Sequence, residues 1–454
     1  MGIVKKNIVL LFFFIVLLNQ SLGGVQRWDL NEQIGMADNL YFDGSLYPNN
    51  DFSIVSIYTP GVSIIAYFFR SLGLSDHLSE LLLACAAITL FLTIILFYKT
   101  IELYRKPNEY FFEIQIIYTF LICLGFVSYS TEFKPDTIAF LLCFFGLYLY
   151  QKNKNIKTMI LGSILIGASI LFKQQSVFFI IGLVFYSLFN FKKKDDLVFT
   201  ILSTFVFSLS TLCLYSFDAI YKFNYKIISD DGFQPFLDVL RFLWDQFKWV
   251  ILTICVLIPL VKRTPANINK YANLLKNPYT YVVGSIFLGS FMSFLKNGGN
   301  TGNIQVGLFY SSLLFWFFFK DIKFKKVSVL ICLLISLISI DLGKIENYRK
   351  YVQDKNMIKS IVGKNLYQNI FTDSDVYSLS RNLRSKTSKI TNYETLKYLN
   401  ILDTISENFF DDFDVIVIKN ELISELKIDS KANLFSKVNG TNRISVYLKN
   451  PSAQ

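Results

Sequence analysis

The sequence predicts an α-helical polytopic membrane protein that carries a small soluble α/β domain at its C-terminal end. Of its 454 residues, 53% are hydrophobic and 17% are aromatic, and the mean hydropathy is +0.42. A soluble domain cannot hide that much apolar surface from water. Long apolar runs recur up to residue 343 and then stop, so we expect a transmembrane module of residues 1–343 and an extracytoplasmic domain of residues 344–454.

The transmembrane module contains about eleven apolar runs that can cross roughly 30 Å of hydrocarbon at about 1.5 Å per helical residue. The first run follows Lys5 and Lys6 as in a signal peptide, but no small-residue cleavage site follows it, so we expect a retained helix. An ion-coupled transporter would usually bury ionisable residues near mid-membrane, and these runs have almost none. The runs lie near residues 7–23, 79–98, 110–129, 137–151, 157–172, 174–190, 197–216, 247–261, 279–295, 304–319 and 327–342.

The basic residues of the loops predict the orientation of these runs. The net charge is +11, and Lys and Arg form short clusters between the runs, a pattern that serves topology and anionic headgroups rather than nucleic acid. If the apolar segment 58–74 stays on the outer side, all these clusters lie in the cytoplasm, and if it crosses, all lie outside. We therefore expect an outer loop of residues 24–78 with juxtamembrane helices. The clusters lie at residues 99–106, 152–157, 192–194, 262–276 and 320–326.

The tail beyond residue 343 has the pattern of an α/β domain. Short β-like segments at residues 415–418 and 444–448 alternate with helical stretches near 393–408 and 420–427. The orientation above places this domain on the outer face of the membrane.

No set of metal ligands can be read from the sequence. All six cysteines fall inside apolar runs without metal-ligand spacing, so they are typical of small buried hydrophobes. The single histidine, His77, excludes a zinc site built from histidines. A requirement for a divalent cation stays open.

Asp29 opens the outer loop just beyond the first apolar run. A carboxylate at the boundary between membrane and water can act as a general base on a hydroxyl group. The alternative is structural, because Asp29 and Glu32 have the spacing of a capping box, in which both carboxylates accept backbone N–H groups. Apolar residues then recur on one helix face, so we expect an amphipathic helix that lies flat with this stripe toward lipid. The stripe consists of Leu30, Ile34, Ala37 and Tyr41.

Two lysines lie in short loops that the orientation places outside. Positive charge there opposes the positive-inside rule, so Lys134 and Lys173 are expected to face a lipid phosphate or a carboxylate of the protein. Asp136 follows a proline and precedes an apolar run, which is also typical of a simple helix start.

The segment from Lys296 to Asn303 combines a cation with glycines directly before a helix. Glycines let consecutive backbone N–H groups point inward, and a helix N-terminus favours an anion, so the segment, with Asn300 at its centre, can cradle a phosphate. A flexible turn between two spans is the alternative interpretation.

These motifs together resemble the GT-C superfamily of membrane glycosyltransferases, in its protein-mannosyltransferase and aminoarabinose-transferase-like branch. The resemblance covers roughly residues 1–190. It departs from the family pattern at Leu30, where many members carry Glu, and at Tyr58-Thr59-Pro60, where they carry Lys-Pro-Pro. The matching residues are Asp29, Ala37, Gly44, Leu46-Tyr47-Pro48, Tyr58-Thr59-Pro60, Lys134-Pro135-Asp136 and the helix from Leu161-Gly162 to Lys173.

The resemblance implies a GT-C-like fold and a role for each site residue. Asp29 would be the catalytic base, and the donor would be a polyprenyl-phosphate sugar used at the outer face of the membrane. We expect the donor phosphate to contact Lys173, Lys296, Lys134 and Arg27. Supporting roles fall to Glu32, Asp136, Tyr58 and Asn300.

The sequence therefore predicts a glycosyltransferase that moves a monosaccharide from a polyprenyl-phosphate donor to a hydroxyl acceptor on a glycan, lipid or protein, with inversion. Abundant Lys, Asn, Ile and Phe favour a bacterial source, and hence the cytoplasmic (inner) membrane. Two alternatives stay open. A flippase-like glycolipid carrier would tolerate an amide at position 29 but usually has repeats and mid-membrane polar residues. A polymerase or ligase would take lipid-diphosphate oligosaccharides instead.

Overall fold

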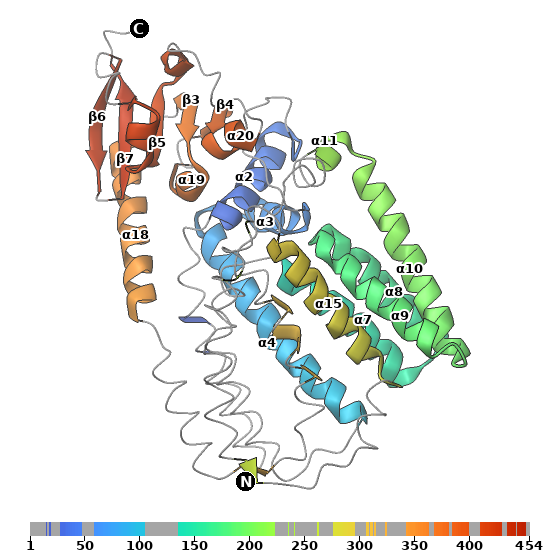
Figure 1. Ribbon diagram of the computed structural model, residues 1–454. Helices are drawn as coiled ribbons and strands as arrows, with labels where there is room; N and C mark the ends of the chain where they lie inside the picture. Colours follow the sequence, from blue (N-terminus) through green and yellow to red (C-terminus); the bar gives the residue numbers. More distant parts are fainter. Residues whose placement is uncertain are drawn as a thin grey trace. The chain divides into compact units, whose positions relative to one another are not determined.

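The computed structural model describes ten segments of the chain and some isolated residues between them: residues 28–47, 59–104, 135–222, 276–295, 342–362, 367–380, 384–398, 409–428, 434–441 and 443–450 (Figure 1). The chain divides into two compact units. Unit 1 comprises residues 1–21, 84–221 and 228–341, and unit 2 comprises residues 22–83, 222–227 and 342–454. The outer loop and the C-terminal tail thus belong to the same unit. The assignment of residues 1–343 and 344–454 as a transmembrane module and an extracytoplasmic domain stays a prediction.

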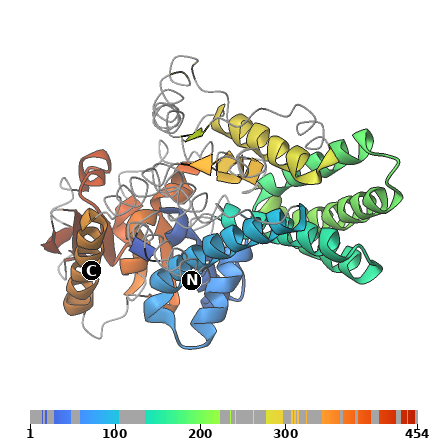
Figure 2. The same ribbon diagram turned by 90° about the horizontal axis from the view of Figure 1, so that it is seen from below.

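Unit 1 is built from long apolar helices, drawn from light blue to yellow in Figures 1 and 2. The helix α4 begins in unit 2 and continues through unit 1. A short antiparallel pair, β1 (Val261–Lys262) with β2 (Lys323–Phe324), also belongs to this unit. The helices are α4 (Leu78–Tyr104), α7 (Asp136–Asn153), α8 (Ile156–Ala168), α9 (Val177–Phe189), α10 (Lys194–Tyr215), α11 (Asp218–Tyr221) and α15 (Pro278–Leu295), with 3-10 turns η4 (Ser169–Leu171) and η5 (Gln174–Ser176).

Three helices among the described residues are long and apolar enough to cross a membrane: Ser75–Tyr104, Lys194–Tyr215 and Pro278–Leu295. Two shorter apolar helices cover Ile156–Leu171 and Gln174–Phe189. All five coincide with predicted apolar runs. The predicted run 137–151 forms the helix α7 but is not among these five. The remaining five predicted runs lie wholly or largely outside the described residues, so the number eleven stays a prediction.

Glycines set the distance between neighbouring helices of unit 1. A Cβ atom added to Gly146 of α7 would lie 2.5 Å from the carbonyl oxygen of Gly162 in α8, and one added to Gly162 would lie 2.6 Å from the carbonyl oxygen of Gly146. On α9, a Cβ at Gly182 would lie 2.5 Å from the Cα of Val282 in α15. Close backbone approach of this kind is how membrane helices gain packing energy when lipid removes the hydrophobic drive between them.

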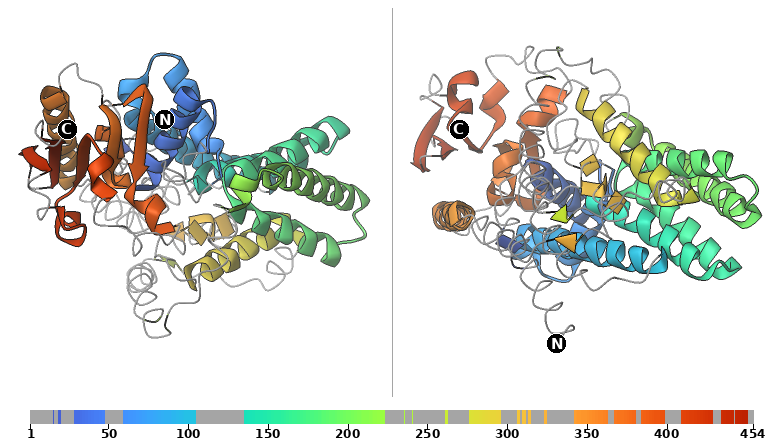
Figure 3. Two further views of the ribbon diagram at one scale, coloured as in Figure 1. Left: turned by 90° about the horizontal axis from the view of Figure 1, so that it is seen from above. Right: turned by 60° about the horizontal axis from the view of Figure 1, so that its bottom comes forward.

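Unit 2 contains a five-stranded sheet in the order β4-β3-β5-β7-β6, orange to red in Figure 3. β3 runs parallel to both β4 and β5, while β7 runs antiparallel to β5 and β6. The central strand β5 is buried on both faces, which explains its unbroken run of β-branched residues. The predicted β-segments at 415–418 and 444–448 are confirmed. The strands are β3 (Tyr367–Thr372), β4 (Arg384–Asn392), β5 (Val415–Lys419), β6 (Phe435–Gly440) and β7 (Ile444–Lys449).

The other elements of unit 2 are helices and short turns. The outer loop supplies α2 (Trp28–Asp43), α3 (Gly61–Ser71) and η2 (Ser75–His77). The tail supplies α18 (Leu342–Val362), η9 (Ser374–Val376), α19 (Tyr377–Ser380), α20 (Tyr393–Tyr398), η12 (Phe409–Asp412) and α21 (Leu422–Glu425). With 11 residues, α3 is about 16 Å long, roughly half the hydrocarbon thickness. It is too short to cross the membrane.

The apolar stripe of α2 does not face lipid, so that expectation was wrong. Leu30, Ile34 and Ala37 are fully buried inside unit 2, and only Tyr41 at the end of the stripe is exposed. The stripe pattern correctly indicates that one face of α2 is covered by apolar groups, but these groups belong to the protein and not to lipid. Packing against α3, η9 and α19 takes the place that we assigned to lipid.

We predict that Gly162→Ala lowers the thermal unfolding midpoint in detergent, because the added methyl forces α7 and α8 apart at a cost of about 1–3 kcal/mol. The matched control is Gly284→Ala in α15, where nothing lies within 4 Å of the added Cβ. There the better helix propensity of alanine should leave stability unchanged or raise it by up to about 1 kcal/mol. Equal midpoints for the two variants would contradict the close approach.

Candidate functional site

The structure describes some of the predicted site residues and leaves others outside. Asp29 falls in the first turn of α2, where its backbone is described and its side chain is not. Glu32, one turn later, is fully buried. Five predicted residues lie outside the described segments: Arg27, Tyr58, Lys134, Lys296 and Asn300.

Helix α2 buries an unusual number of polar side chains. Burying such groups is costly unless they are hydrogen-bonded, so they indicate specific docking rather than simple apolar packing. One contact is clear: Ser63 of α3 donates a 2.6 Å hydrogen bond to Oε1 of Gln33. The set, each at most 1% exposed, is Asn31, Glu32, Gln33, Asp38 and Asn39.

Asp38 joins α2 to two other elements of unit 2. One carboxylate oxygen pairs with the guanidinium of Arg70 in α3. The other accepts a 3.1 Å hydrogen bond from the hydroxyl of Tyr377 in α19. The Arg70 guanidinium also lies 4.4 Å from the ring centre of Tyr41 and 4.5 Å from that of Phe42, which adds cation–π attraction. We name Asp38, Arg70 and Tyr377 the Asp38 junction.

In unit 1 the structure brings together two predicted site residues from different motifs. Nζ of Lys173 lies 3.4 Å from Oδ2 of Asp136, with both side chains at most 5% exposed. Asp136 begins α7, and Lys173 lies in the extended turn between η4 and η5, where its carbonyl accepts a 2.7 Å hydrogen bond from Ser176. The sequence left a phosphate or a carboxylate open as the partner of Lys173. The structure supplies a carboxylate, and the phosphate contact stays a prediction.

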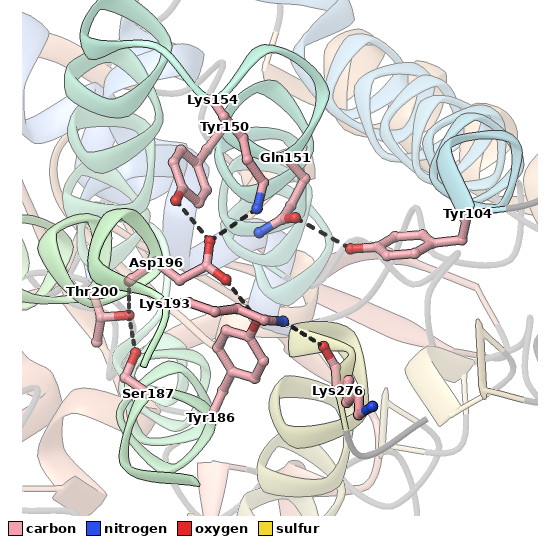
Figure 4. Close-up of polar contacts among 10 residues, drawn as sticks. All are labelled: Tyr104, Tyr150, Gln151, Lys154, Tyr186, Ser187, Lys193, Asp196, Thr200 and Lys276. Carbon is pink, nitrogen blue, oxygen red and sulfur yellow. Dashed lines mark hydrogen bonds and ion pairs between the residues drawn. The ribbon is translucent and has the colours of Figure 1, made fainter. Parts of the chain in front are cut away.

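A second carboxylate, which the sequence did not single out, lies at the other end of α7 (Figure 4). Asp196, in the first turn of α10, accepts 2.7 Å hydrogen bonds from the hydroxyls of Tyr150 and Tyr186. Lys154 adds an ion pair at 3.2 Å. Asp196 therefore ties the ends of α7 and α9 to the start of α10.

Lys193 extends this network toward α15 (Figure 4). Its ammonium donates to the Tyr186 hydroxyl at 3.1 Å and to the carbonyl oxygen of Lys276 at 3.4 Å. The donors and acceptors of these residues bond to one another, and we call them the Asp196 network. We interpret this network as a structural contact that holds α7, α9, α10 and the start of α15 together.

No group of three potential metal ligands occurs among the residues that the structure describes. Among the predicted site residues, unit 2 contains a base candidate on α2, and unit 1 contains a carboxylate–ammonium pair at the start of α7. Such groups suit proton transfer from a hydroxyl and orientation of an anionic leaving group.

We predict that Lys173 and Asp136 are energetically coupled. Lys173→Met leaves a buried carboxylate without its ion-pair partner and should cost about 3–5 kcal/mol of unfolding free energy, and Asp136→Asn should also be costly. The double variant should be more stable than the sum of the two losses predicts. Thermal unfolding of all four proteins in one detergent measures the coupling, and additive losses would contradict the pair.

No protein-family model and no curated protein sequence matches the chain. Among solved structures, the chain is similar to the crystal structure of ArnT from Cupriavidus metallidurans bound to undecaprenyl phosphate. The TM-score is 0.58 at 11% sequence identity, and the match covers 100% of this chain and 98% of that chain. At this identity the likeness shows the fold. The chain therefore shares the fold of that structure, and three of its described helices are long and apolar enough to cross a membrane, as in an integral membrane protein.

Proposed function

We propose that this protein is a GT-C-type glycosyltransferase that moves a monosaccharide from a polyprenyl-phosphate donor to a hydroxyl acceptor at the outer face of a bacterial cytoplasmic membrane. The observation that carries the proposal is the fold, shared over the whole chain with a transferase structure that holds undecaprenyl phosphate. Asp29 supports it, because it stands where the family resemblance puts the catalytic base. Acceptors on a glycan, a lipid or a protein all fit this chemistry.

In the proposed reaction Asp29 takes the proton from the acceptor hydroxyl as its oxygen attacks the anomeric carbon. The new bond joins that oxygen to the anomeric carbon. The bond from the anomeric carbon to the donor phosphate breaks, and the polyprenyl phosphate leaves with the electron pair. Attack opposite the leaving group inverts the configuration.

Cations stabilise the charge that develops on the departing phosphate. We assign this role to Lys173, Lys296, Lys134 and Arg27, with Asn300, Tyr58 and Glu32 supporting. The ion pair with Asp136 gives Lys173 a fixed position, so Asp136 acts by orienting an ammonium rather than by binding the sugar. A divalent metal could share the phosphate charge without altering this scheme.

We predict that Asp29→Asn lowers sugar transfer by at least about 100-fold, the contribution typical of a general base. The assay uses purified protein in liposomes, a panel of radiolabelled polyprenyl-phosphate monosaccharides, and a membrane extract as the source of acceptor. The matched control is Asp43→Asn, which removes an exposed carboxylate from the other end of the same helix and should retain full turnover.

Near-normal transfer by Asp29→Asn would refute the assignment of the base. Equal movement of label across the bilayer by both proteins, with no new glycosidic product, would favour a glycolipid carrier. Transfer from lipid-diphosphate oligosaccharides alone would favour a polymerase or ligase.

A further inference from the structure

The C-terminal tail holds the helix that carries Asp29. Within unit 2, α2 packs along α3 on one side and contacts η9 and α19 of the tail on another. Figures 1 and 3 show α19 beside α2, although their nearest ends, Asp43 and Tyr377, are 334 positions apart in the sequence. A membrane enzyme that needed only its spans and outer loop would have no use for this contact.

The Asp38 junction is the polar centre of the contact. The Asp38 side chain is 1% exposed and that of Arg70 is 10% exposed, and Tyr377 is fully buried. A buried carboxylate is stable only where hydrogen-bond donors surround it. The junction therefore fixes the position of α2 as well as attaching it to α3 and α19. Arg70 comes from the outer loop itself, whereas Tyr377 comes from the tail.

The sheet fixes the position of Tyr377. Asp373 follows β3 directly and is fully buried. One of its oxygens accepts the backbone N–H of Val376 at 3.2 Å, which starts the turn before Tyr377, and the other accepts the backbone N–H of Lys419 at the end of β5 at 2.8 Å. Burial raises the pKa of Asp373 to about 6, while these N–H donors act to lower it. A continuous set of contacts thus leads from the sheet to α2.

We propose that the C-terminal domain is the positioning element of the transfer site, and that the hydroxyl of Tyr377 sets the placement of Asp29 by holding Asp38. This inference rests on the proposed function, because it takes Asp29 as the base. Asp29 and Asp38 are nine positions apart on one helix, about 14 Å along its axis. A tilt of about 5° around Asp38 therefore moves residue 29 by about 1 Å, and a misplacement of that size can cost about 100-fold in rate.

The test compares two variants that each remove one tyrosine hydroxyl from the tail. Tyr377→Phe removes the bond to Asp38 and keeps the ring. The matched control is Tyr393→Phe, because Tyr393 is also buried and its hydroxyl bonds a carboxylate, that of Glu425, within the tail itself. Two quantities are measured on the full-length protein: backbone amide exchange of α2 and β5, and kcat and KM for the donor that the wild type uses.

We expect Tyr377→Phe to speed amide exchange in α2 at least tenfold while β5 is unchanged. Its kcat should fall tenfold or more with a smaller change in donor KM, since three of the four cations assigned to the donor phosphate, Lys173, Lys296 and Lys134, are not part of α2. Tyr393→Phe should leave α2 exchange and kcat at wild-type values.

Wild-type kcat and wild-type α2 exchange in Tyr377→Phe would overturn the inference. Equal losses in both variants, with faster exchange in β5, would also overturn it, because they would show general loosening of the domain. If the wild type transfers sugar from no donor, the proposed function fails, and the exchange measurement still decides whether Tyr377 holds α2.

Discussion

A carboxylate removed from water must find its partners elsewhere in the chain, and this constraint organises the polar contacts of both units. Asp38 meets Arg70 and Tyr377, Asp136 meets Lys173, and Asp196 meets two tyrosines and Lys154. In each case the partners come from a different helix or turn than the carboxylate. The carboxylates therefore decide which elements are neighbours, while apolar and glycine contacts decide how closely they pack.

In unit 1, polar contacts and close apolar contacts lie at different positions along the helix α7. Asp136 lies at the first residue of α7, and Tyr150, which bonds Asp196, lies in its last turn. Between them, α7 offers Gly146 to α8 and Phe144 to the rings of Phe97 and Tyr310. α7 is therefore held at its two ends by polar contacts and between them by close apolar packing.

The sequence predicts elements better than it predicts partners. The apolar runs that form α4, α10 and α15 are predicted by their length, and the strand at Val415–Lys419 by its run of β-branched residues, and the structure contains them. The stripe of Leu30, Ile34 and Ala37 correctly predicted a helix, but the prediction that it faces lipid was wrong. Periodicity indicates that one face of a helix is buried, and it does not indicate what covers that face.

In the candidate site, too, the sequence predicts some residues and misses the partners that hold them. The sequence singles out Asp29, Asp136 and Lys173 because each lies beside an apolar run on the side predicted to be outer, and because all three belong to the family resemblance. The sequence does not single out Asp38, because its partners lie 32 and 339 positions away along the chain. Tyr377 likewise carries no local sign of its role. Lys173 and Asp136 could have been paired only by knowing that the turn before α9 meets the start of α7.

The C-terminal tail holds the outer loop at two points of very different strength. At the head of α4, Lys359 pairs with Asp76 at 3.2 Å and Lys355 with Glu80 at 3.7 Å, and the first of these pairs is largely exposed. Exposed pairs contribute about 0–1 kcal/mol, whereas breaking a buried pair such as that of Asp38 costs about 3–5 kcal/mol. The Lys359–Asp76 pair therefore contributes less to holding the outer loop than the Asp38 junction does.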